Sequence, residues 1–140
     1  MQPHTLAIWN LIAAWAGLLA GMGAGAVVGI FFGSEDFAGG YGSWPRRLMR
    51  LGHISFFGLA VVNFMYYFTT VALPGPLSRY EGQLPGQLPG VLLIAGAILM
   101  PTVCYLSAWR AGVRHAFFLP VGCLITGVGL TLIHIIGVLS

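Results

Sequence analysis

The chain has 140 residues, of which 58% are hydrophobic and 6% are charged, and its formal net charge at pH 7 is +3. An ordinary soluble domain carries roughly a quarter charged residues, so this composition excludes a soluble globular protein. The length accommodates about four membrane-spanning segments of ~20 residues each, and we expect a single transmembrane domain over residues 1–140.

The first predicted span covers about residues 6–32, a stretch in which no residue is charged. As a helix it would measure about 40 Å, enough to cross a bilayer with some tilt. Glycine recurs at every fourth position, at Gly17, Gly21, Gly25, Gly29 and Gly33. Small residues at this spacing let two helix backbones approach closely, a pattern typical of a glycine zipper. We expect the stripe to pack against a helix of the same chain, with the fourth span as a candidate. A face for another subunit and a ligand or pore surface are the alternatives.

The second predicted span covers about residues 52–73 and contains a polar stripe. His53, Asn63 and Tyr67 fall on one side of a helix with about 100° per residue. An unpaired amide near mid-bilayer costs free energy, so Asn63 must face protein, a cofactor or water. We expect an interhelical hydrogen bond there. Contact of Asn63 or Tyr67 with a quinone or another small ligand is the alternative.

The second half of the chain predicts a hairpin of two further spans. Residues 74–90 repeat Gln-Leu-Pro-Gly at 83–86 and 87–90, which favours turns over a helix. The third span covers about residues 91–109 and contains Pro101, whose ring removes one helical hydrogen bond and can open a cavity. A short connection leads to the fourth span, at about 116–139, so these two spans should be antiparallel neighbours.

The distribution of arginine predicts the orientation. All the basic side chains are arginines: Arg46, Arg47 and Arg50 between the first two spans, Arg110 and Arg114 between the last two, and Arg79 alone in the middle connection. Cytoplasmic connections carry an excess of basic residues. We therefore expect an all-α, integral membrane four-helix bundle with both termini on the non-cytoplasmic side of a bacterial plasma (inner) membrane. This topology accounts for the arginines, so no nucleic-acid binding is implied.

The histidines are the titratable side chains closest to the spans. His53 and His115 begin the second and fourth spans at similar predicted depth, and His4 and His134 lie toward the opposite face. Imidazole pairs on neighbouring helices can hold a haem iron. We expect His53 and His115 to be interfacial, and His134 to hydrogen-bond a neighbouring helix. Ligation of haem b or of a metal ion, whose identity the sequence does not indicate, is the alternative role for His53 and His115, and a ligand or proton-relay role is the alternative for His134.

The predicted spans contain no Asp, Glu, Lys or Arg. A proton-coupled exchanger or a carboxylate-metal enzyme normally needs an embedded carboxylate, so both classes are disfavoured. No nucleotide-binding, nucleophile or zinc motif is present, and we predict no catalytic residue. The leading hypothesis is a non-catalytic or accessory subunit of a larger membrane complex, surrounded by the lipid bilayer. Its partners would be copies of itself or other membrane subunits, with haem or quinone as candidate cofactors.

The alternative hypothesis is a small-solute transporter or channel that acts as an oligomer, because four helices enclose little space. Its pathway would run along the glycine stripe, Asn63, Thr126 and the Pro101 kink.

Overall fold

The computed structural model describes residues 7–73 and 84–139. This part of the chain is all-helical, with four long helices: α1 (Ala7–Ile30), α2 (Trp44–Ala72), α4 (Leu84–Trp109) and α5 (Phe118–Leu139). Two short 3-10 helices, η1 (Phe37–Gly39) and η2 (Ala111–Phe117), lie in the first and last connections. All four long helices supply segments that are long and apolar enough to cross a membrane, which is the architecture of an integral membrane protein.

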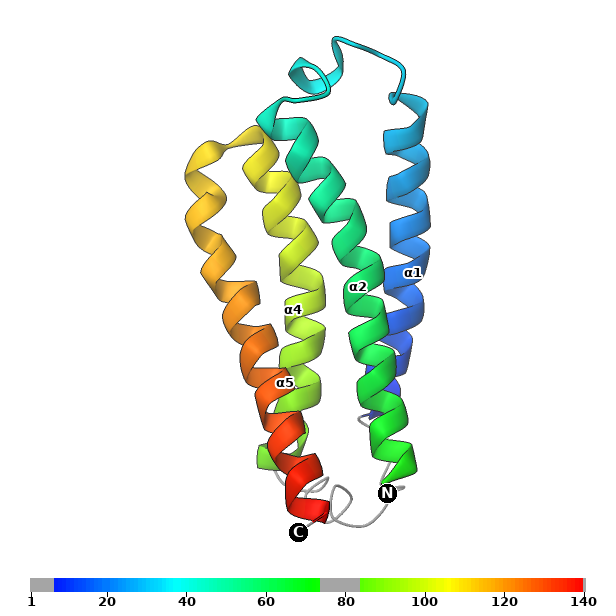
Figure 1. Ribbon diagram of the computed structural model, residues 1–140, viewed down its shortest axis with the longest axis vertical. Helices are drawn as coiled ribbons and strands as arrows, with labels where there is room; N and C mark the ends of the chain where they lie inside the picture. Colours follow the sequence, from blue (N-terminus) through cyan, green and yellow to red (C-terminus); the bar gives the residue numbers. More distant parts are fainter. Residues whose placement is uncertain (1–6, 74–83, 140) are drawn as a thin grey trace.

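The helices stand side by side in the order α1, α2, α4, α5 (Figure 1). α1 packs on α2, α2 packs on α4 and α4 packs on α5, whereas α1 meets α4 to a much smaller extent. α1 begins and α5 ends at one end of the molecule, and the two connections that carry arginine lie at the other (Figure 1). The bundle is therefore open, because α5 is attached through α4 and does not close against α1.

α2 begins at Trp44, well before the predicted start at about residue 52. The Ser43 side chain caps the helix by accepting a hydrogen bond from the backbone N–H of Arg46, and Pro45 occupies the first turn, where a missing donor costs nothing. A hydropathy criterion stops at the arginines, but capping extends the helix through them. The arginines of this segment consequently lie on the first turns of α2 and not in a loop.

α4 begins at Leu84, so the expectation of turns over residues 84–90 is wrong. Pro89 lies near the start of this helix, where it removes only one backbone donor. The carbonyl of Gly90 accepts a hydrogen bond from the Asn10 side chain, which ties this segment to α1. The remainder of the predicted connection, including Arg79, lies outside the described residues.

Arg46 organises the connection between α1 and α2. Its side chain is 3% exposed, and its guanidinium donates to the backbone carbonyls of Ser34 (3.0 Å) and Phe32 (2.6 Å), just beyond the end of α1. The guanidinium also lies over the rings of Phe32, Phe37 and Tyr41, at 5.3–5.9 Å from their centroids. The guanidinium also reaches the carbonyl of Phe31, directly after α1 (3.5 Å), so Arg46 supplies donors to the end of this helix and to the turn that follows it.

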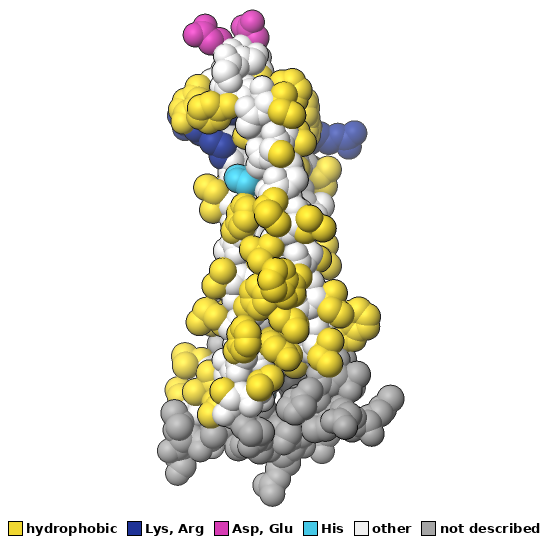
Figure 2. Space-filling model, turned by 90° about the vertical axis from the view of Figure 1, so that its right-hand side faces the viewer, with side chains coloured by type: hydrophobic (Ala, Val, Ile, Leu, Met, Phe, Trp, Pro, Cys, Tyr) yellow, Lys and Arg dark blue, Asp and Glu magenta, His cyan; other side chains and the backbone are white. Residues whose placement is uncertain are grey.

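A hydrophobic cluster joins the two arginine-bearing connections. Leu48 and Met49 of α2 pack with Ala108 of α4, and Phe37 of η1 and Phe117 of η2 pack against them. At this end the acidic side chains are outermost and the arginines lie nearer the middle of the molecule (Figure 2). Hydrophobic side chains are spread over the face along α1. One end of the molecule is thus a packed, charged cap on an apolar helical body.

Candidate functional site

The glycine stripe of α1 meets α2 over part of its length. A Cβ added at Gly17 would lie 3.3 Å from the Cβ of Ala60, and one at Gly25 would lie 2.5 Å from Cε1 of His53. A Cβ added at Gly21 would lie 2.9 Å from Cε2 of Phe57, which is also on α2. Side chains larger than hydrogen at these positions would force the two helices apart. Gly17, Gly21 and Gly25 therefore face α2, and the fourth span is not their partner.

Gly29 and Gly33 differ from the rest of the stripe. A Cβ added at either residue would meet nothing within 4 Å in the described part of the chain. Gly29 lies in the last turn of α1 and Gly33 in the turn that follows the helix, and both residues are exposed. The regular spacing thus continues beyond the contact that uses it.

His53 lies in the interface between α1 and α2. The ring edge formed by Cε1 and Nε2 faces Gly25, and the ring of Phe57 contacts it edge-on at 5.3 Å between centroids. The Nδ1 atom is buried and has no hydrogen-bond partner in the described part of the chain. The packing of the ring edge on Gly25 gives His53 a structural role in the α1–α2 contact. Haem ligation remains a prediction.

The other histidines lie on separate surfaces. His115 is exposed on η2, which packs on α4 and α5, whereas His53 faces α1. His134 is half-buried on α5 and has an interaction partner. His4 lies outside the described residues. Among the residues that are described, no group of three or more His, Cys, Asp or Glu side chains is placed to hold a metal ion.

Asn63 belongs to a buried amide pair that joins three helices. The side-chain nitrogen of Asn10 donates to Oδ1 of Asn63 (2.8 Å) and to the carbonyl of Gly90 (3.0 Å). The side-chain nitrogen of Asn63 donates to the carbonyl of Leu59, within α2 (2.9 Å), and reaches that of Leu93 on α4 (3.5 Å). Both asparagines are at most 1% exposed. Asn63 thus makes the expected interhelical hydrogen bond, and α1, α2 and α4 are tied at one level.

Sequence reasoning missed Asn10. It is the only asparagine of the first predicted span, and a lone amide in an apolar helix is itself a signal for a buried polar partner. Tyr67, predicted beside Asn63, is half-buried and contacts Phe68 edge-on. Its neighbour Tyr66 is instead buried against Gly90. Within the predicted polar stripe of α2, His53 and Asn63 therefore contact other helices, whereas Tyr67 contacts Phe68 of its own helix.

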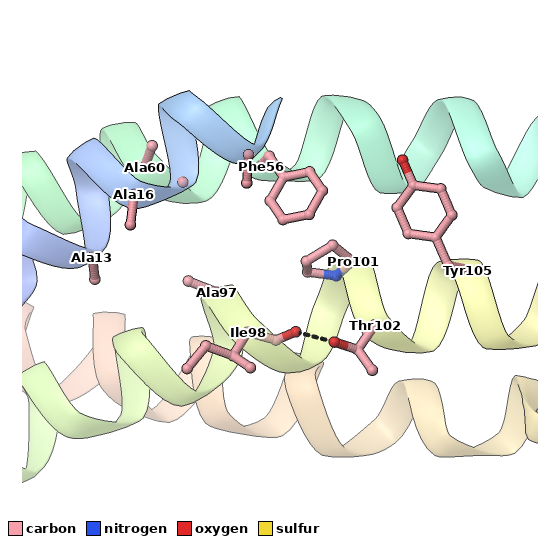
Figure 3. A pocket seen from close by; sticks show the side chains of 11 residues that line it. Ala13, Ala16, Phe56, Ala60, Ala97, Ile98, Pro101, Thr102 and Tyr105 are labelled. Carbon is pink, nitrogen blue, oxygen red and sulfur yellow. Dashed lines mark hydrogen bonds between the residues drawn. The ribbon is translucent and has the colours of Figure 1, made fainter. Parts of the chain in front are cut away.

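A groove of about 360 Å³ lies between α1 and α4, over α2. Small side chains line most of it: Ala13, Ala16, Gly17 and Ala20 from α1, Ala60 from α2 and Ala97 from α4. Figure 3 shows Ala13 and Ala16 on one side of the groove and Ala97 on the other, with the rings of Phe56, Pro101 and Tyr105 toward one end. The only hydroxyl other than that of Tyr105 in the lining belongs to Thr102, which donates to the Ile98 carbonyl of its own helix.

The alanines of this groove form a second small-residue face on α1. Ala13, Ala16 and Ala20 are spaced by three and four residues, so they share one side of the helix, about 100° around from the glycines that face α2. In the half of α1 that carries the groove, the other exposed residues are large, among them Ile8, Ile12 and Leu19. Small side chains in this half of the helix are thus buried or line the groove, whereas the second half also exposes Gly23, Ala26 and Gly29.

A second groove, of about 290 Å³, lies between α2 and α5. Its walls are larger and branched, with Val62 and Met65 from α2 and Val128, Leu132 and Ile135 from α5. Side chains of this size keep two helix backbones farther apart than alanine and glycine do. The α1–α4 groove is therefore the better candidate for a specific contact.

The fold and the grooves define the class of this protein, an all-helical chain with four candidate membrane spans. No protein-family model matches it, and the curated proteins and the solved structures contain no match either.

Proposed function

We propose that this chain is a non-catalytic subunit of a larger membrane assembly, and that the α1–α4 groove receives a transmembrane helix of the assembly. The observation that carries the proposal is the alanine lining of an open groove between two helices that the fold leaves apart. The partner is another membrane subunit or a second copy of this chain.

The physical reason lies in what drives helix association within lipid. Apolar side chains gain little by leaving lipid tails, so helices associate through close van der Waals contact, which small residues permit. On a surface that contacts only lipid, replacing leucine by alanine brings no gain in packing. The contrast between the alanine-lined groove and the large exposed side chains on the same half of α1, such as Ile12 and Leu19, supports a helix as the occupant.

The transport alternative receives less support. Asn63, the polar residue of the predicted pathway, has both polar side-chain atoms engaged in hydrogen bonds. The packed glycines of α1 are covered by α2, and Thr126 lies on α5, at a different surface. The groove lining contains no ionisable carboxylate or basic group. Because its polar atoms already hold helices together, Asn63 supports a structural role and is not available to a passing solute.

Three finer features complete the proposal. The excess of arginine at one end favours an orientation with that end in the cytoplasm and both termini outside, in a bacterial plasma membrane. Gly17, Gly21 and Gly25 act as a glycine zipper within the chain, which leaves the alanine face for the partner. Haem or quinone would belong to the assembly, and a reduced-minus-oxidised visible spectrum of the co-purified complex tests for the haem.

The test is co-purification of the tagged chain from its native membrane in a mild detergent. We expect stoichiometric partner chains with the wild type, and a loss of about tenfold with Ala16→Leu or Ala97→Leu, which fill the groove. The control is Ala26→Leu, the same substitution at an exposed position of α1 that does not line the groove. A wild-type chain that elutes as a monomer without partners would contradict the proposal, as would groove variants that retain them.

A further inference from the structure

Three exposed arginines lie at the capped end of the molecule. Arg47 is on the first turns of α2, and Arg110 and Arg114 flank or belong to η2. We call these three residues the arginine rim. Arg50 lies beside it but is partly engaged, since its guanidinium stacks on the ring of Tyr41 at 4.4 Å and donates to the Tyr41 carbonyl.

The rim is held by packed structure. The hydrophobic cluster of Leu48, Met49 and Ala108 fixes the start of α2 against the end of α4, and Phe117 adds η2 to it. The indole N–H of Trp44 also donates to the carbonyl of Ser107, across the same two helices (3.4 Å). The arginines of the rim are therefore carried by elements that are already packed together, which lowers the ordering cost when a ligand binds.

The surroundings of the rim place it at headgroup depth. Trp44 is 51% exposed and Trp109 is 74% exposed at the same end, and amphipathic indole rings prefer the interface between hydrocarbon and water. The carboxylates of this end, Glu35 and Asp36, lie farther out along the molecule than the arginines (Figure 2). In the described part of the chain this end carries five arginines, from Arg46 to Arg114, against those two carboxylates.

We propose that the arginine rim binds the phosphate group of an anionic phospholipid in the adjacent leaflet. A guanidinium donates two parallel hydrogen bonds to a phosphate, and surplus positive charge favours a headgroup with net negative charge over a zwitterionic one. The exposed tryptophans beside the rim would contact the glycerol and upper acyl region of the same leaflet. The inference is independent of the proposed function and of which side of the membrane this end faces.

Native mass spectrometry of the full chain in detergent tests the inference. Phosphatidylglycerol and phosphatidylcholine with identical acyl chains are titrated separately, and we expect the wild type to retain the anionic lipid at least fivefold more. The variant R47Q/R110Q/R114Q should retain both lipids about equally. The control E35Q/D36N neutralises side chains of the opposite charge at the same end, and it should keep or increase the preference. Arg46 is left intact because it caps α1.

Ionic strength supplies a second measurement that needs no variant. Because the attraction is electrostatic, raising the salt concentration should lower the ratio of anionic to zwitterionic lipid that the wild type retains. Circular dichroism and elution volume check that the triple variant folds, as expected for changes at exposed side chains. Equal retention of the two lipids by the wild type would overturn the inference. A preference that survives the triple substitution, or that does not respond to salt, would overturn it as well.

Discussion

Asn10 and Asn63 have the largest structural role of the uncharged polar side chains in this apolar protein, since one pair of amides connects three helices. In a membrane such bonds are worth less than their isolation from water suggests, because polar groups of the unfolded chain also find partners in the bilayer. The larger effect comes from removing one amide, which leaves its buried partner without a hydrogen bond.

The first prediction concerns this amide pair. Asn63→Leu should lower the free energy of unfolding by about 1–3 kcal/mol, because Asn10 keeps only its bond to Gly90. Unfolding by denaturing detergent in mixed micelles measures the change. Thr69→Val is the control, since that hydroxyl bonds only to the Met65 carbonyl of its own helix and should cost far less. Equal losses for the two variants would show that the buried pair adds nothing particular.

The second prediction concerns the buried arginine. Arg46→Gln should destabilise the protein by about 2 kcal/mol or more, since charge-assisted hydrogen bonds to the end of α1 and contacts with three rings are lost. Arg46→Lys should restore only part of the loss, because an ammonium is not a planar fork that spans several carbonyls. Arg47→Gln, at an exposed site one residue away, should be nearly neutral.

Amide hydrogen exchange locates the effect of the Arg46 variants. Faster exchange should be concentrated in the last turn of α1 and in the connection that follows it. Unchanged exchange there, with a loss of stability elsewhere, would remove the capping role that the structure gives to Arg46.

The sequence predicts the polar residues better than it predicts their partners. A helix in lipid must pair its amides, so an interhelical bond at Asn63 follows from the sequence alone. The identity of the partner does not, because it depends on which turn of α1 lies opposite. Arg46 likewise looks equivalent to Arg47 in the sequence, and only the position of the end of α1 makes one buried and the other exposed.

At the scale of the helices, glycine sets how closely neighbours approach. The contact between α4 and α5 is reciprocal: Leu124 of α5 lies over Gly96 of α4, and Leu93 of α4 lies over Gly127 of α5. Each leucine fills the space that a missing side chain leaves, in the manner of knobs and holes. The same principle joins α1 to α2 through Gly17, Gly21 and Gly25.

The third prediction separates packed glycines from open ones in α1. Gly25→Leu should weaken the α1–α2 contact because the new side chain meets the ring of His53, whereas Gly29→Leu should be tolerated in open space. His53→Ala in the Gly25→Leu background should recover part of the stability, since it removes the obstructing ring. Unfolding in denaturing detergent measures the free energy of unfolding of the wild type and of the three variants. If Gly25 and Gly29 behave alike, the packing of α1 differs from the one described.

The fourth prediction concerns the attachment of α5. Gly127→Leu should displace α5, because a Cβ there already approaches Leu93 and the Pro89 carbonyl at 3.0–3.2 Å. Gly129→Leu, two residues away in open space, is the control. Hydrogen exchange should accelerate along α5 in the first variant and stay unchanged in α1 and α2, since α5 packs mainly on α4 and η2. Acceleration throughout the chain would instead mean that the helices unfold as one unit.

The helices themselves were largely predictable, because long apolar segments in lipid have little choice but to be helical. Their starts were not. α2 begins through its arginines at a Ser43 cap, and α4 begins through a Pro/Gly-rich segment that reads as turns. Local signals of hydropathy and proline lose to capping and to the contact between Gly90 and Asn10, which only the packed structure shows.

At the scale of the whole molecule, the order of packing determines what surface remains. The sequence predicts four spans, but not that they stand in an open row, because pairing follows from side-chain fit between particular faces. His53 and His115 show the same limit: similar predicted depth does not make two residues neighbours when one lies on α2 and the other on η2, which packs on α4 and α5. The alanine face of α1 becomes visible only once the glycine face is known to be covered by α2.

The central claim is that the α1–α4 groove holds a helix of another chain in the native membrane. The most direct measurement is photo-crosslinking in intact cells, with a diazirine-bearing amino acid at Ala16 in the groove and, separately, at exposed Met22. We expect a discrete protein adduct from position 16. This adduct should be absent from position 22 and should be lost with Ala97→Leu. Lipid adducts alone from both positions would contradict the central claim.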